Sequence, residues 1–126
     1  MQASPPFRTY ETFAPVRVDE IRPGVAVYDF GQNASMMPRL RVRGPAGASV
    51  KVIPAELLKA DGSVDRTSAG VGEASWNYTL AGRAEGETWF PRFFYHGSRY
   101  LQVERAAPAG SRPTKPTPAR RARYPR

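Results

Sequence analysis

The chain has 126 residues, of which 40% are hydrophobic, 11% are aromatic and none is cysteine. This composition fits one globular domain and excludes disulfides, thiol catalysis and metal sites built on thiolates. The net charge of +8 comes mostly from residues 106–126, which carry six Lys and Arg and no acid, so the rest of the chain is almost neutral.

No signal peptide is recognisable at the start of the sequence. Residues 1–14 lack a basic start followed by an apolar stretch, and no apolar run approaches the roughly 20 residues of a membrane span. We expect residues 1–14 to be an extension or linker, and we expect no membrane partner.

Alternating apolar and polar residues then predict a series of strands. Residues 16–21 alternate with one slip, and residues 25–30 form a compact apolar run between glycines. In residues 39–43, two apolar side chains face one way and three arginines face the other. The turn residues 44–47 and the apolar segment 48–58 predict that this strand returns as an antiparallel hairpin.

The second half of the chain repeats the pattern. Asp61-Gly62 is a turn signal, and residues 75–82 form a strand whose large side chains (Trp76, Tyr78 and Leu80) share one face. Residues 87–95 and 98–105, joined by His96 and Gly97, predict a final hairpin. No window has the period and length of a long helix, so residues 15–105 are predicted to be an all-β antiparallel β-sandwich of about seven strands.

The last segment, residues 106–126, has a different composition. It is rich in proline, alanine and arginine and offers almost nothing to bury. It is predicted to be a disordered basic tail.

The stretch "DFGQN" at residues 29–33 is predicted to be a corner of the sheet. Gly31 permits a positive φ, Asp29 and Asn33 can bond nearby backbone amides, and Gln32 can tie the corner to the next strand. A ligand-contacting loop and a catalytic element are the alternative interpretations.

Catalytic and metal chemistry find little support in the residues. The acids are dispersed over strand ends and turns, whereas a glycosidase needs two that converge on a cleft. His96, the only histidine, is interpreted as a turn residue. One histidine without cysteine disfavours zinc, and a calcium site from Asp29, Asn33 and Asp61 matches no known loop spacing. No catalytic residue, metal or cofactor is predicted.

Carbohydrate binding is the site hypothesis that the residues allow. Aromatic rings stack on sugar faces, and nearby amides and acids fix the hydroxyls, although the alternation of most rings favours burial in the core. The candidate sugar-contacting residues are Asp29, Gln32, Asn33, Trp76, Tyr78, Tyr95 and His96.

Four segments in this order resemble a known family: "PGVAVYDFGQNASMMPRLRVRGPAG", "PAELLKADGSV", "WNYTLAG" and "ETWFPRFFYHGSRYLQVE". Together they resemble the concanavalin-like, jelly-roll β-sandwich module of bacterial α-L-rhamnosidases, which are family 78 glycoside hydrolases. The resemblance covers residues 16–104. The chain departs from the family pattern at Met36-Met37-Pro38, where the family usually has a glycine and an aromatic or aliphatic residue, and at Ser98, where it usually has phenylalanine.

The resemblance implies a non-catalytic accessory module. In that family the module precedes an (α/α)6 barrel that holds the catalytic acids, so the expected partners are this barrel and a rhamnose-containing glycan. A stand-alone carbohydrate-binding module is the alternative. Attachment to an anionic surface through the basic tail is a weaker one, and no specific nucleic acid is expected.

Overall fold

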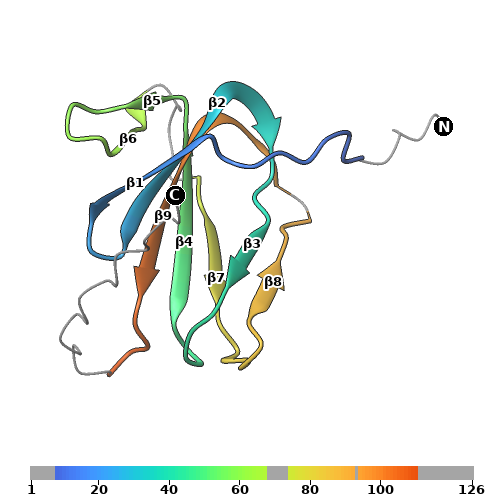
Figure 1. Ribbon diagram of the computed structural model, residues 1–126, viewed down its shortest axis with the longest axis vertical. Coiled ribbons are helices and arrows are strands. Elements are labelled where there is room, and N and C mark those ends of the chain that lie inside the picture. Colours follow the sequence, from blue (N-terminus) through green and yellow to red (C-terminus); the bar gives the residue numbers. More distant parts are fainter. Residues whose placement is uncertain (1–7, 68–73, 93, 111–126) are drawn as a thin grey trace, which may run out of the picture.

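The computed structural model describes residues 8–67, 74–92 and 94–110, and its assigned elements are nine β-strands (Figure 1). Five of them form one antiparallel sheet in the order β1-β2-β9-β4-β7. These strands are β1 (Arg17–Arg22), β2 (Val25–Met36), β9 (His96–Ala106), β4 (Ser49–Ala55) and β7 (Trp76–Thr79). Two short ribbons complete the fold: β3 (Leu40–Val42) with β8 (Glu87–Trp89), and β5 (Leu57–Leu58) with β6 (Val64–Asp65).

The main core lies on one face of the five-stranded sheet. Its buried residues come from β2, β4, β7, β9 and the residue after β7, and the inward side chains of the β3–β8 ribbon pack against them. The buried members are Met36, Val50, Val52, Trp76, Leu80 and Leu101. The opposite face carries a smaller cluster of Ile53, Ala55 and Val64, to which β6 contributes. Burial on both sides of the sheet confirms the all-β sandwich.

Two predicted hairpins are wrong. The segments 39–43 and 48–58 do not pair with each other, because β3 pairs with β8 and β4 lies in the main sheet between β9 and β7. Residues 44–47 do turn, but the turn carries the chain from one sheet to the other. The alternation within the first strand is confirmed: Leu40 and Val42 are half-buried, and the three arginines beside them are exposed.

The predicted final hairpin is wrong for the same reason. His96 and Gly97 belong to β9 itself, where they pair with Met36 and Ser35 of β2. The chain instead crosses from the β3–β8 ribbon to the main sheet in the residues between β8 and β9. The predicted faces of β7 are confirmed, since Trp76 and Leu80 are buried while Asn77 is exposed.

The predicted corner at residues 29–33 is confirmed as a sharp bend within β2 (Figure 1). The pairing of β2 with β9 is interrupted between Asp29 and Ala34, and Gly31 has a φ of +78°. The Asp29 carboxylate accepts the Gly31 backbone N–H at 2.7 Å. This short bond and the left-handed glycine together hold the bend.

Replacing Gly31 by valine should therefore lower the free energy of unfolding by about 1–3 kcal/mol, because a β-branched residue is strained at this φ. A Cβ there would also lie 3.3 Å from Val16 Cγ2. Urea unfolding measures the change. The matched control is Gly97→Val, at a glycine with open space around its Cβ position, which should shift stability by no more than about 0.5 kcal/mol. Equal effects of the two substitutions would contradict the requirement for a glycine at this bend.

Ser98, where the resembling family usually has phenylalanine, is fully buried in β9 opposite Ala34. In the described part of the chain its hydroxyl has no hydrogen-bond partner. The strand nevertheless continues through it to Ala106, where the pairing with Ser49 ends the ladder.

The described residues include no helix long and apolar enough to cross a membrane. The basic tail was predicted to be disordered. From residue 111 onward, it lies outside the described part of the chain.

Candidate functional site

The β2 bend places Asp29 beside a partner that the sequence did not suggest. The Arg99 guanidinium donates from Nε to Asp29 Oδ1 at 2.9 Å and from Nη2 to Oδ2 at 3.0 Å. This two-point ion pair lowers the pKa of Asp29 below its usual 3.8, and the Gly31 N–H adds to the effect. The Arg99 guanidinium also lies 5.0 Å from the centre of the Tyr100 ring. Asp29 is therefore a charged carboxylate whose hydrogen bonds stabilise the bend.

The other two candidate residues of the bend, Gln32 and Asn33, have separate environments. The Asn33 amide donates to Glu56 Oε1 at 2.7 Å instead of bonding a backbone amide, and Gln32 is exposed. Asp61, the third oxygen ligand of the calcium hypothesis, accepts the backbone N–H and the hydroxyl of Ser63. In the described ranges no group of three or more His, Asp or Glu side chains is arranged to hold a metal ion.

Trp76 and Tyr78, both candidate sugar-contacting residues, point into the main core. The Trp76 indole is buried and donates from Nε1 to the Phe94 carbonyl at 3.2 Å. The half-buried Tyr78 donates its hydroxyl to Glu87 Oε1 at 2.7 Å, and its ring lies 5.4 Å from that of Trp89. These contacts give both rings a packing role.

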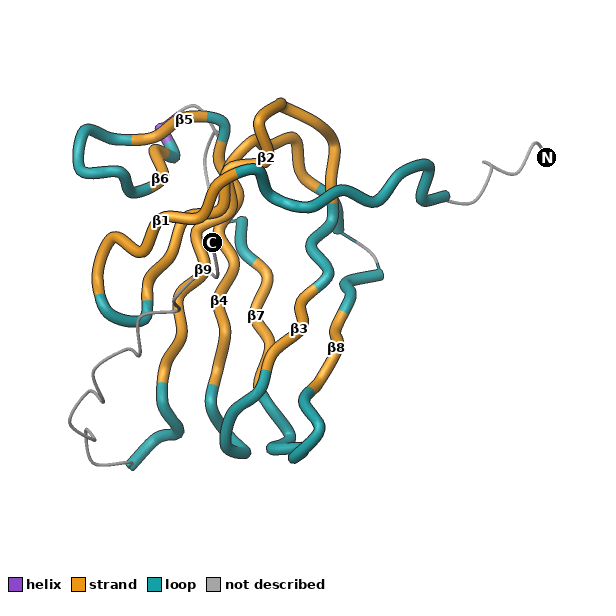
Figure 2. Tube along the Cα trace, viewed as in Figure 1, coloured by secondary structure: helices purple, strands orange, loops and turns teal. Residues whose placement is uncertain are grey.

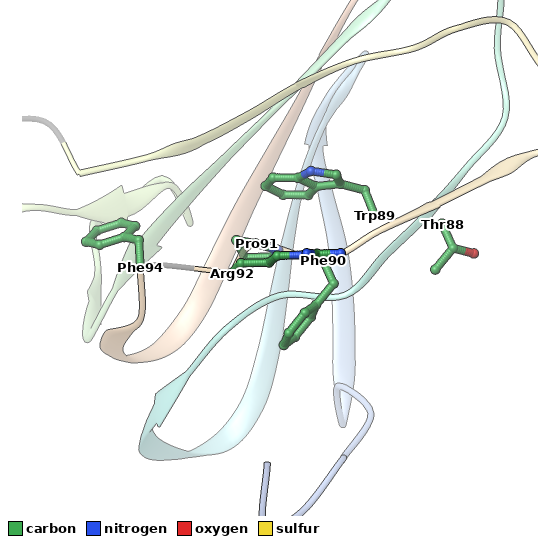
Figure 3. Close-up of a pocket in the computed structure, with 6 residues that line it drawn as sticks. All are labelled: Thr88, Trp89, Phe90, Pro91, Arg92 and Phe94. Carbon is green, nitrogen blue, oxygen red and sulfur yellow. The ribbon is translucent and has the colours of Figure 1, made fainter. Parts of the chain in front are cut away.

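Three exposed aromatic residues lie instead on the chain between β8 and β9. Phe90, Phe94 and Tyr95 are 41%, 38% and 51% exposed. An open depression of about 700 Å³ is lined by Thr88, Trp89, Phe90, Pro91, Arg92 and Phe94 (Figure 3). The side chains of Trp89 and Phe90 point to opposite sides of the strand in that view, as alternation requires. With its aromatic lining, this depression resembles a sugar-binding site.

The seven candidate residues do not form one site. His96 does not line the depression, but its ring centre lies 6.1 Å from that of Phe94, which does. The His96 Nδ1 atom lies 2.8 Å from the Gly97 carbonyl oxygen. Asp29 projects from the sheet face opposite to Trp76, because its neighbour Tyr28 packs against the main core. Sequence reasoning missed Thr88, Phe90 and Arg92, although the aromatic run at residues 89–94 marks this segment as rich in rings.

Comparison with known proteins identifies relatives for most of the chain. Residues 19–119 match the family described as the bacterial alpha-L-rhamnosidase concanavalin-like domain. An α-L-rhamnosidase of Streptomyces avermitilis is 41% identical over 102 residues, which are 81% of this chain and 10% of that protein. An α-L-rhamnosidase of Formosa agariphila is 29% identical over 107 residues, or 82% of this chain and 11% of the relative.

Solved structures of such enzymes contain the same fold. The Streptomyces avermitilis α-L-rhamnosidase complexed with L-rhamnose is 42% identical with a TM-score of 0.68, covering 72% of this chain and 9% of that one. The α-L-rhamnosidase from Dictyoglumus thermophilum is 31% identical with a TM-score of 0.73, covering 85% and 12%. The chain thus spans about a tenth of the length of the curated relatives it matches.

Proposed function

The chain belongs to the concanavalin-like domain family of bacterial α-L-rhamnosidases, and on that premise we propose that it is a non-catalytic module of such an enzyme. Its partner in this proposal is the (α/α)6 catalytic barrel, against which it packs. The observation that carries the proposal is the short, well-matched stretch of about a tenth of each relative. The acids that hydrolyse the glycoside then belong to the part of the enzyme that this stretch leaves out.

The carboxyl groups of the chain support a structural role. A glycosidase acid must hold its proton near neutral pH, which requires a raised pKa. The described carboxyl groups whose pKa departs from the ordinary value all have it lowered by hydrogen bonds: Asp29, Asp61, Asp65 and Glu87. Each of these groups is held as an anion that fixes a turn or a strand.

A stand-alone carbohydrate-binding module is the second candidate, favoured by one observation. The depression between β8 and β9 is lined by aromatic rings and a threonine hydroxyl, a combination that suits the stacking of a sugar ring. Titration of the chain with L-rhamnose, followed by the tryptophan fluorescence of the wild type and of the Trp89→Phe variant, distinguishes this candidate from a purely packing role.

The proposed function is tested by incubating the purified chain with an aryl α-L-rhamnoside. No release of the aryl group is expected, because the described acids with a shifted pKa all have it lowered, whereas the proton donor of a glycosidase needs a raised pKa. Turnover that disappears in the Asp29→Asn or Glu56→Gln variant would show that the chain is itself a hydrolase and would overturn the proposal.

A further inference from the structure

The outer face of the β3–β8 ribbon carries a straight row of arginines. Arg39, Arg41 and Arg43 are exposed, while the residues between them turn inward to the core. Alternate residues of an antiparallel strand lie about 6.8 Å apart, so the row spans roughly 13.6 Å. The ribbon therefore presents three arginine side chains, at alternate backbone positions, to solvent.

The strand beside this row supplies no counter-charge. Arg41 pairs with Thr88, and the same register continued by one residue in each direction places Arg39 beside Phe90 and Arg43 beside Gly86. The one acid of β8, Glu87, is 7% exposed and points inward to Tyr78. Within the described part of the chain, none of the three arginines has an ion-pair or hydrogen-bond partner.

Cross-strand pairs of opposite charge stabilise sheet surfaces, and like charges along one strand repel each other. The three exposed arginines beside Phe, Thr and Gly therefore repel one another, and a bound anion would relieve this repulsion. Glu85, an exposed acid before β8, stands near only one end of the row. The row of arginines therefore suits a ligand whose anionic groups are spaced along a line.

We propose that this outer face binds an acidic polysaccharide. The arginines pair with carboxylate or sulfate groups along the polymer, and the Phe90 ring, 41% exposed at the end of the row, stacks on a sugar ring. Thr88, which also lines the depression, offers a hydroxyl between the two. The proposal rests on the proposed function only for the expectation that the ligand is a glycan.

The geometry favours a polysaccharide over an acidic protein surface. A linear polymer with repeated charges matches a straight row, and an exposed ring beside the cations adds the apolar contact that sugar rings require. The chain has other basic groups, and three exposed ones lie away from the ribbon: Arg22 on β1, Lys59 in the β5–β6 connection and Arg105 on β9 (Figure 1). These three serve as a control of equal charge.

The test measures binding of the full chain to polygalacturonate and to dextran sulfate by titration calorimetry, with neutral dextran and polyphosphate as comparisons. The variant R39Q/R41Q/R43Q should bind the preferred acidic polysaccharide at least about tenfold more weakly, whereas R22Q/K59Q/R105Q should change affinity less than about threefold. Phe90→Ala should weaken binding about threefold or more without altering its salt dependence. All seven side chains are exposed, so the variants should fold, which circular dichroism verifies.

The preferred polymer distinguishes carboxylate from sulfate recognition. The proposal is overturned if neither acidic polysaccharide binds, if the two triple variants lose affinity equally, or if polyphosphate binds as tightly and Phe90→Ala changes nothing. The assay contains no rhamnoside and measures no turnover. Its failure is therefore distinct from a failure of the proposed non-catalytic function.

Discussion

Replacing Gly82 by alanine should lower the free energy of unfolding by about 3 kcal/mol, through backbone strain and a steric clash. Gly82 has a φ of +81°, and a Cβ there would lie 2.6 Å from the Ala46 backbone nitrogen and 2.9 Å from its Cβ. The turn before β4 and the turn after β7 lie side by side at one end of the molecule (Figure 2). They are tied by Gly47 N–H donating to the Leu80 carbonyl at 2.9 Å.

The facing turn offers a control with the same strain and no clash. Gly47 has a φ of +82°, and its added Cβ would meet its nearest neighbour, Pro108 Cβ, at an ordinary 3.5 Å. Gly47→Ala should cost only about 1–2 kcal/mol. Urea unfolding of both variants measures the difference. A cost at Gly82 no greater than that at Gly47 would mean that the two turns separate freely and that their contact contributes nothing.

Replacing Glu87 by glutamine should lower the thermal midpoint at pH 7 by roughly 10 °C. The buried carboxylate accepts the Tyr78 hydroxyl at 2.7 Å and the backbone N–H groups of Ala81 and Gly82 at 2.9 and 3.0 Å. A glutamine has one acceptor oxygen, so at least one of these three donors loses its partner. The matched control is Glu85→Gln, an exposed glutamate two residues earlier, which should leave the midpoint nearly unchanged.

The effect of Glu87→Gln on the thermal midpoint should depend on pH. The hydrogen bonds to Glu87 hold its pKa in the folded state below the ordinary 4.5, and the Ala81 N–H contributes most. A lowered folded pKa adds stability above the unfolded pKa and loses it as pH falls through the folded value. The difference in midpoint between the wild type and Glu87→Gln should therefore shrink below about pH 4.5. A difference that stays constant down to pH 3 would contradict this account of Glu87.

Local features were predictable because they depend on neighbouring residues alone. The alternation of Trp76 and Leu80 with polar residues predicted the buried face of β7, and the glycine in "DFGQN" predicted the bend in β2. Each of these features follows from strand periodicity or from the φ angles that one residue type allows. The sandwich class followed from the same signals, repeated along the chain.

Pairing between distant strands was not predictable in the same way. Residues 44–47 look like a hairpin turn, but turn chemistry does not specify whether the next strand returns beside the first or enters another sheet. β3 instead pairs with β8, and this register decides what stands beside the arginine row. The ion pair of Asp29 with Arg99 joins residues 70 positions apart, for which the sequence holds no local signal.

The proposed function places this chain against the catalytic part of an α-L-rhamnosidase, and a chimera measures whether it packs there. The segment of the Streptomyces avermitilis enzyme that matches this chain at 41% identity would be replaced by the corresponding residues of this chain, beside a version with the segment deleted. We expect the chimera to hydrolyse an aryl α-L-rhamnoside at a rate within about tenfold of the parent, or 1.4 kcal/mol in activation free energy, and the deletion to be inactive or insoluble. A chimera that performs no better than the deletion would contradict the proposed packing.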